Sequence, residues 1–406
     1  MLPRTALTIA LAALTATPAR LPAQQRPAPP PKPPTLEELE ARAQRDSLDP
    51  EAHFLLARRY YRLNRLNDEE RELRATTAVD PRYAPAYLWL GFLPYDRRPK
   101  LWEEERKGKI PEALRPAVEQ SYRLRRQAFL IDPMVDFRVA GAKAPAEDMV
   151  IVPEYGRYTT EYMLWLGLGA FGDGRYELAY GALKAWVERA YPKQPRDSFP
   201  DFFFLFQGLA AAHERAYKTG IDDFQVLLDR SLKAEQADTL MPFPLGTNDY
   251  RYVLGVLHQL WGKPADAMRL YQEAIASDLG LYMAHVRLAQ MYREYKMWDK
   301  AIEEARRAIE TNPDDATAVL ELGVILAEAG RAPEAEQTLG QAAAANPRDP
   351  RPIYHLGVVR QQLAKPGEAR EALTRFVAIA PPSRYETQIA DAKQRLAALG
   401  QGDGTH

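Results

Sequence analysis

Candidate chemical groups in this chain are a glycine-rich run, a histidine–glutamate pair and scattered histidines. Gly167 to Gly172 reads G-L-G-A-F-G and matches the G-x-G-x-x-G pattern that binds dinucleotide phosphates. That pattern requires a strand before it and a helix that begins at it, whereas here it lies inside a run with helical periodicity. His213-Glu214 could begin a zinc-protease helix, but no second histidine stands four residues after His213. We therefore predict neither a nucleotide site nor a zinc site of this kind.

The other histidines and the missing cysteines also argue against catalysis. No two histidines have the i, i+4 spacing that would place them together on one helix face as metal ligands; they are His53, His213, His258, His285, His355 and His406. The absence of cysteine excludes disulfides, cysteine-ligated zinc, iron–sulfur clusters and thiol catalysis. A Walker loop and a G-x-S-x-G elbow are absent as well. The sequence predicts no enzyme, no cofactor, no metal and no small-molecule substrate.

Composition narrows the class of protein further. The chain has 406 residues, with 54 lysines and arginines against 55 aspartates and glutamates. This balance lacks the basic excess of a dedicated nucleic-acid binder, so no nucleic-acid partner is predicted. Hydrophobic residues make up 46% and charged residues 27% of the chain, which is typical of folded soluble domains.

The elements that would position any functional residue follow a repeat of 34 residues. Small residues, leucines and prolines recur at this spacing, and they define four contiguous units at 248–281, 282–315, 316–349 and 350–383. The clearest series are Ala267, Ala301, Ala335 and Ala369; Leu254, Leu288, Leu322 and Leu356; Gly255, Ala289, Gly323 and Gly357; and Pro313, Pro347 and Pro381. Within the second unit, Leu288, Met291, Tyr292 and Tyr295 share one helical stripe, which predicts a packing face.

With this period, and with small residues at the eighth, twentieth and twenty-seventh positions of each unit, the chain resembles the tetratricopeptide repeat (TPR) family. The resemblance implies an all-α fold, a right-handed α-α superhelix of about seven helix pairs. Residues 384–400 are expected to form a capping helix, and 401–406 a flexible tail. The family's large aromatic residue at the fourth position is absent, since Arg251, His285, Val319 and Ile353 stand there.

The N-terminal half carries the same pattern with defects. Residues 35–135 are predicted to form TPR-like repeats with an insertion at about 94–115, because Pro133 follows Pro81 by 52 residues and not by 34. Residues 136–247 form a degenerate TPR-like region with irregular loops. Two of these loops, 136–158 and 237–247, do not fit the period, and either partner contact or plain packing would explain them.

The first residues are predicted to be an export signal. Arg4 is followed by a short apolar run, Thr5 to Ala16, which is too short to span a bilayer and fits a secretory signal peptide over residues 1–23. Cleavage after Ala19 is the competing site, and a retained anchor is the other alternative. Residues 24–34 form a proline-rich linker, either a spacer or a ligand for a proline-binding domain.

The resemblance also implies a concave partner-binding groove, lined by the first helix of each unit. Its predicted residues are Tyr252, Val256, Gln259, Val286, Gln290, Arg293, Leu320, Val324, Tyr354, Val358 and Gln361. Such a surface would suit an amphipathic helix or an extended apolar segment of another protein. The first hypothesis is an exported, non-catalytic scaffold that binds a protein or peptide partner in the periplasm or cell envelope. The alternatives are an accessory subunit docked permanently on a membrane complex, and an enzyme with a site in 136–247.

Overall fold

The computed structural model describes residues 34–135, 160–172, 174–237 and 245–401. Within these ranges the chain is helical, with nineteen α-helices, two short 3-10 helices and no strand. The prediction of an all-α solenoid is confirmed. Five predicted segments lie wholly or mostly outside the described residues: the export signal at 1–23, nearly all of the linker at 24–34, the loop at 136–158, most of the loop at 237–247 and nearly all of the tail at 401–406.

The helices pair in chain order, and consecutive pairs pack against each other within two runs, the first two pairs and the last six. Eight pairs lie in the described ranges, where the sequence indicated about seven. They are α2 (Pro50–Arg62) with α3 (Leu66–Val79), α4 (Ala84–Arg97) with α6 (Arg115–Ile131), α8 (Thr160–Gly172) with α9 (Tyr176–Ala190), α10 (Asp201–His213) with α11 (Tyr217–Gln236), α12 (Thr247–Leu260) with α13 (Pro264–Ser277), α14 (Tyr282–Glu294) with α15 (Trp298–Thr311), α16 (Ala316–Glu328) with α17 (Ala332–Ala345), and α18 (Pro350–Gln362) with α19 (Pro366–Ile379). Helix α1 (Leu36–Arg45) precedes the first pair, and α20 (Pro382–Gln401) covers the last.

Small residues allow the two helices of a pair to approach closely. A Cβ added at Gly323 would lie 2.7 Å from Leu339 of the partner helix, and one at Gly357 would lie 2.6 Å from Leu373. In the second unit, alanines stand at both of the equivalent positions, Ala289 and Ala305, and both are buried. Where the first position is glycine, the position sixteen residues later therefore carries a large side chain. This size matching fixes the distance between the helix axes.

The turn inside each C-terminal pair has one residue in the left-handed backbone conformation. Gly262, Lys296, Gly330 and Ala364 stand 34 residues apart, and their φ angles are 74°, 57°, 77° and 57°. Glycine adopts this conformation without the steric cost that a Cβ brings. Two of the four turns therefore carry backbone strain that the other two avoid.

Ala364→Gly is accordingly expected to raise the free energy of unfolding by about 0.5–1 kcal/mol, because it removes the clash of the Cβ in the left-handed region. Gly330→Ala, the reverse change at the equivalent turn, should lower it by a similar amount. No atom outside the turn would meet the added Cβ at position 330, so the comparison isolates backbone strain. Urea unfolding of both variants measures the effect, and a shift of the same sign in both would contradict it.

Between α4 and α6 the chain forms α5 (Leu101–Arg106) and the 3-10 helix η1 (Glu112–Leu114). Tyr95 of α4 donates a hydrogen bond to Glu105 of α5 at 2.9 Å, and the guanidinium of Arg125 lies 5.4 Å from the Tyr95 ring. These contacts fasten the inserted residues to the pair. A second 3-10 helix, η2 (Arg196–Ser198), precedes α10.

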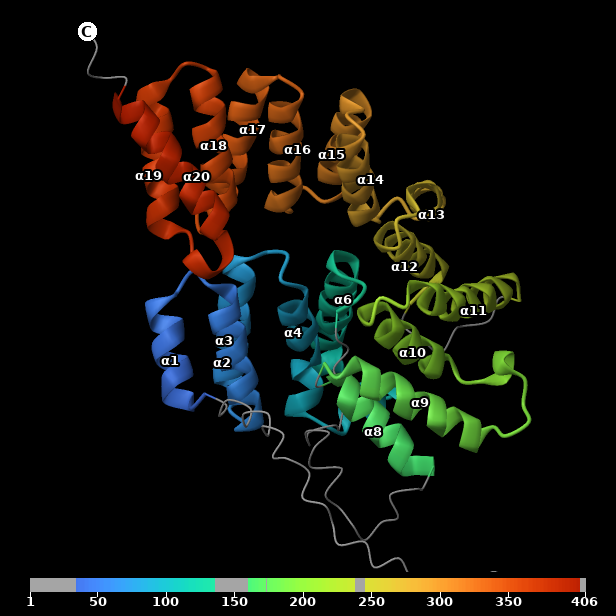
Figure 1. Ribbon diagram of the computed structural model, residues 1–406. Helices are drawn as coiled ribbons and strands as arrows, with labels where there is room; N and C mark the ends of the chain where they lie inside the picture. The colour runs from blue at the N-terminus through green and yellow to red at the C-terminus, as the bar shows by residue number, and fades with distance from the viewer. Residues whose placement is uncertain (1–33, 136–159, 173, 238–244, 402–406) are drawn as a thin grey trace, which may run out of the picture.

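The array curves round until its two ends meet (Figure 1). Helices α1 to α6 form one stack, here called the N-terminal block, and α8 to α20 form a second. Arg384 at the start of α20 reaches Asp80 in the loop after α3 at 2.9 Å, which joins the end of the second stack to the first. No helix in the described ranges is long and apolar enough to cross a membrane.

Candidate partner-binding groove

The predicted groove residues divide into a buried set and a half-buried set. Four residues form the buried set, with side chains only 0–4% exposed: Tyr252, Val256, Val286 and Leu320. The half-buried set is Gln259, Gln290, Arg293, Val324, Tyr354, Val358 and Gln361. The first set cannot be reached by a partner while the described contacts persist, so the surface available along this face is smaller than the sequence pattern indicated.

The polar members of the groove are already held by other groups of the chain. Gln259 accepts a hydrogen bond from Tyr271, and Gln290 donates one to Glu321 at 3.1 Å, which Arg293 also approaches at 3.5 Å. In the last unit, α20 supplies the partners: Tyr354 donates to Asp391 at 2.7 Å, and Gln361 accepts from Arg395 at 2.9 Å. Such bonds give the groove a fixed shape.

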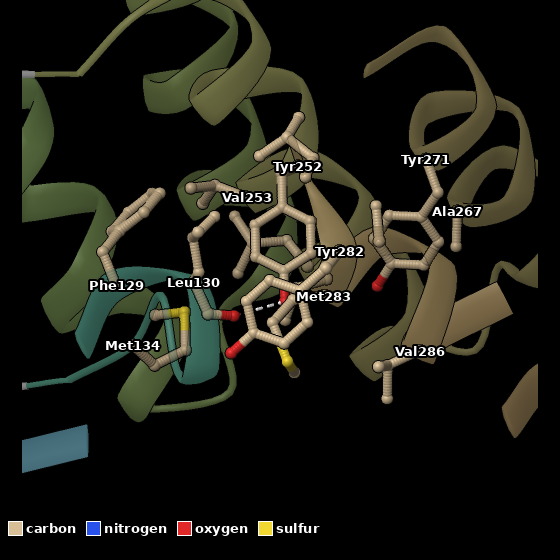
Figure 2. Close-up of a cluster of buried hydrophobic side chains, with 14 of the residues drawn as sticks. Phe129, Leu130, Met134, Tyr252, Val253, Ala267, Tyr271, Tyr282, Met283 and Val286 are labelled. Carbon is tan, nitrogen blue, oxygen red and sulfur yellow. Dashed lines mark hydrogen bonds between the residues drawn. The ribbon is translucent and has the colours of Figure 1, made fainter. Parts of the chain in front are cut away.

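At its start, the groove is filled by the last residues of α6 and the turn that follows them, residues 129–134, here together called the C-terminal turn of α6 (Figure 2). Phe129, Leu130 and Met134 belong to the same buried cluster as groove-side residues of α12 and α14, among them Tyr252, Tyr282 and Met283. The Tyr252 hydroxyl donates to the backbone oxygen of Leu130 at 2.7 Å, and Gln127 donates to the Tyr282 hydroxyl at 2.8 Å. The N-terminal block therefore contributes the side chains that fill the groove at this end.

Charge complements the apolar contact at this end. The guanidinium of Arg287 lies 3.5 Å from the backbone oxygen of Ile131, at the terminus of α6 where unpaired carbonyls concentrate negative charge. Burial alone would lower the pKa of Arg287, but Tyr252, Tyr271 and Asp132 outweigh it, and the net pKa is raised. Burial raises the pKa of the Tyr252 hydroxyl, so this group stays a hydrogen-bond donor.

A second contact joins the rims of the two stacks. Arg82, in the loop after α3, lies 3.5 Å from Asp315 and 3.9 Å from Glu321. Asp80 accepts from Arg384 at 2.9 Å, and these carboxylates are mostly buried, with exposures of 12% at Asp80 and 6% at Asp315. Burial alone would lower the pKa of Arg384, but Asp80 raises it overall. We call these four residues, Asp80, Arg82, Asp315 and Arg384, the rim latch.

His355 makes the stability of the last unit depend on pH. Burial and the nearby Arg293 and Arg351 lower the pKa of His355 to about 4. The unfolded chain binds a proton at this residue below about pH 6.5, whereas the folded chain does so only near its lowered pKa, so stability is lost as the pH falls between these values.

Because of this difference, the contribution of His355 should fall by about 2 kcal/mol between pH 7 and about pH 4.5. Urea unfolding of the wild type and of His355→Gln over this range isolates the contribution, since His53, whose hydrogen bond to Glu72 raises its pKa, changes in both proteins alike. A constant difference between the two proteins at all pH values would contradict the assignment.

The sequence pattern missed an exposed apolar strip at the turns of two adjacent units. Leu260 and Trp261 are 51% and 41% exposed, and Tyr295 and Met297 are 53% and 40% exposed. Tyr295 was expected on the packing face of its helix; that interpretation is wrong, because the helix ends at Glu294 and turns the ring outward. Trp261 and Tyr295 stand 34 residues apart, and this recurrence was the signal that could have revealed the strip.

The glycine-rich run and two of the histidines have packing roles. Gly167 lies in α8, and a Cβ there would meet Leu183 at 2.7 Å. His53 bonds Glu72, and His285 bonds Glu304, each at 2.7 Å across its helix pair. Among the described residues, no group of three His, Asp or Glu could hold a metal ion.

Among the described residues of the region 136–247, one acid has a perturbed pKa. Asp223 on α11 is fully buried, and burial raises its pKa to about 7 while the neighbouring Arg196 works against the shift. The Arg196 guanidinium also stacks on Phe204 at 5.0 Å. An apolar hollow among the described residues of this region lies elsewhere, between Met163 and Leu166 of α8 and Leu178 of α9. Asp223 therefore anchors η2 to α11 and does not face that hollow.

One family model matches part of the second stack. Residues 292–354 match the family model described as tetratricopeptide repeat. No curated protein matches the chain. Among solved structures, the C-terminal part of a TPR repeat-containing protein from Cytophaga hutchinsonii is 12% identical, covers 61% of this chain and 90% of its own, and has a TM-score of 0.46. Yeast Tom70 is 13% identical over 91% of this chain and 95% of its own, with a TM-score of 0.42.

YrrB, described as a TPR protein with an unusual peptide-binding site, is 17% identical over 52% of this chain and 97% of its own, with a TM-score of 0.34. Each of these TM-scores is below 0.5, and nothing about the partner of this chain follows from them. The helix pairs of 34 residues and the family match are consistent with each other: the described chain is an all-α solenoid, and its residues 292–354 match the tetratricopeptide repeat model.

Proposed function

We propose that this chain is an exported, non-catalytic scaffold that binds a protein or peptide partner through the groove of residues 248–383. The observation that carries the proposal is the row of half-buried side chains at groove positions of the last two units, Val324, Tyr354 and Val358. Stacked pairs hold this row on rigid helices, and apolar side chains in such a row suit an apolar segment of another protein. The exposed strip around Trp261 and Tyr295 would extend the contact surface.

Affinity capture from the native envelope fraction tests this proposal. Val324→Asp with Val358→Asp places two charges in the groove and should reduce recovery of the partner by on the order of tenfold or more, because each desolvated charge opposes an apolar contact. Ala344→Asp on the exposed face of α17 is the matched control. Equal recovery by both variants would contradict binding through the groove.

The alternative is an accessory subunit that stays docked on a membrane complex, through the inserted residues near α5 or the loop at 136–158. Co-purification through detergent and high salt would favour this alternative over transient binding of a segment. Export itself is tested by the mass of the mature protein, which should begin after Ala23 or Ala19 if the signal is cleaved.

A further inference from the structure

The N-terminal block is a unit with its own cores. Three buried clusters lie within α1 to α6, around Leu39, Phe54 and Leu88. Among the described helices, α6 packs against α4 and η1, and stacking begins again with α8 on α9. The block therefore meets the second stack through side chains and not as the next member of a continuous solenoid.

The end of α6 departs from this arrangement. Phe129, Leu130 and Met134 join the core of the second stack, with exposures of 1%, 4% and 9%. Leu130 contacts the groove residue Tyr252 through its backbone oxygen, and Tyr282 and Met283 belong to the same buried cluster (Figure 2). The turn thus occupies the groove as a bound helix end would, with apolar side chains inward and its terminal carbonyls facing Tyr252 and Arg287.

The rim latch holds the same block from its other edge. Asp80 and Arg82 come from the block, whereas Asp315 and Arg384 come from the second stack. Arg384 is 37% exposed, so salt can weaken its attraction to Asp80. The described contacts between the two stacks are therefore the apolar turn, the rim latch and a few further polar contacts, among them Arg126 with Asp278 at 2.7 Å and His213 with the backbone oxygen of Met134 at 2.7 Å.

We propose that the N-terminal block is an intramolecular competitor, which occupies the start of the groove with the C-terminal turn of α6 and is held there by the rim latch. This inference rests on the proposed function, because it takes the groove as the partner site. The partner that replaces the block presents the same chemistry: a helix end with bulky apolar side chains, whose carbonyls accept hydrogen bonds from Tyr252 and Arg287.

Two kinds of introduced cysteine test whether the N-terminal block occupies the groove in the full mature chain, which has no cysteine of its own. Spin labels at Ala78→Cys and Ser383→Cys, both exposed and close in sequence to the latch, report the distance between the stacks. A thiol at Met283→Cys, 3% exposed in the wild type, reports access to the groove. Ala305→Cys, buried inside its helix pair, is the control for unfolding.

Arg384→Glu places two carboxylates together at the latch, and Asp80→Arg with Arg384→Glu restores an ion pair with the charges exchanged. We expect Arg384→Glu to lengthen the label distance and to speed labelling of the Met283→Cys thiol on the order of tenfold. The exchanged pair should return both values to those of the wild type, and raising salt from about 0.05 M to about 1 M should act like the single change. Labelling at Ala305→Cys should stay slow throughout.

An unchanged label distance under both charge reversal and high salt would overturn the proposal. If the distance between the spin labels increases but the Met283→Cys thiol still reacts slowly, the claim that α6 blocks the groove is overturned. If Arg384→Glu unfolds the chain, rapid labelling at Ala305→Cys reveals it, and the salt series still decides the question. These measurements need no partner, so their failure is distinct from a failure of partner capture.

Discussion

Tyr252→Ala is expected to lower the free energy of unfolding by about 3–4 kcal/mol, the range for truncating a buried aromatic side chain. Tyr252 is fully buried, its ring lies 5.8 Å from that of Tyr271, and its hydroxyl donates to Leu130. The alanine variant loses the packing on both sides and leaves the Leu130 carbonyl without this donor. Urea unfolding measures the loss, with circular dichroism to confirm that the variant folds.

Tyr252→Phe separates the two contributions, because it keeps the ring and removes the hydroxyl. Its loss should be only about 1 kcal/mol, the usual net value of one hydrogen bond. A loss below about 1 kcal/mol for Tyr252→Ala would show that the contact with α6 is not formed in solution. The phenylalanine variant is also the suitable one for partner capture. With the alanine variant, a lower recovery of the partner could result from unfolding of the chain instead of a lost contact.

Gly323→Ala is expected to lower the free energy of unfolding by about 3 kcal/mol, because the close approach of two helices leaves no room for a methyl group. The added Cβ would lie 2.7 Å from two atoms of Leu339 and 3.3 Å from the Leu339 backbone nitrogen. The backbone cannot move away without disturbing the stack on either side. Chemical unfolding of the full chain measures the loss.

Leu339→Ala supplies the matching change on the partner helix and should itself cost about 2–4 kcal/mol through the cavity that it leaves. The double variant reproduces the pair that the second unit already has, Ala289 with Ala305. Its loss should therefore be clearly smaller than the sum of the two single losses. Additive losses would mean that the pairing of sizes does not set the distance between the helices.

Much of the fold follows from spacing alone. Alanine, leucine and proline at intervals of 34 residues indicate paired helices, since no other common architecture has this period with small residues at those positions. The pairing of Gly323 with Leu339 was not predicted, because it relates two positions sixteen residues apart whose side chains meet only once the helices are packed.

The candidate site was predictable only as a row of positions. Repeat positions place Tyr252 and Val286 on the concave face, but they do not say what lies opposite. The meeting of Asp80 with Arg384, 304 residues apart, depends on the small rotation from each pair to the next, summed over the whole array. The exposure of Trp261 and Tyr295 likewise depends on where each helix ends, which is the least reliable feature of a sequence pattern.

Small-angle X-ray scattering of the mature chain at low ionic strength tests most directly whether the stacked pairs close on themselves. The account predicts a profile that agrees with the described arrangement, in which the N-terminal block contacts α20 and the end of α6 enters the groove. A profile that requires an extended solenoid, with its first and last pairs far apart under the same conditions, would contradict it.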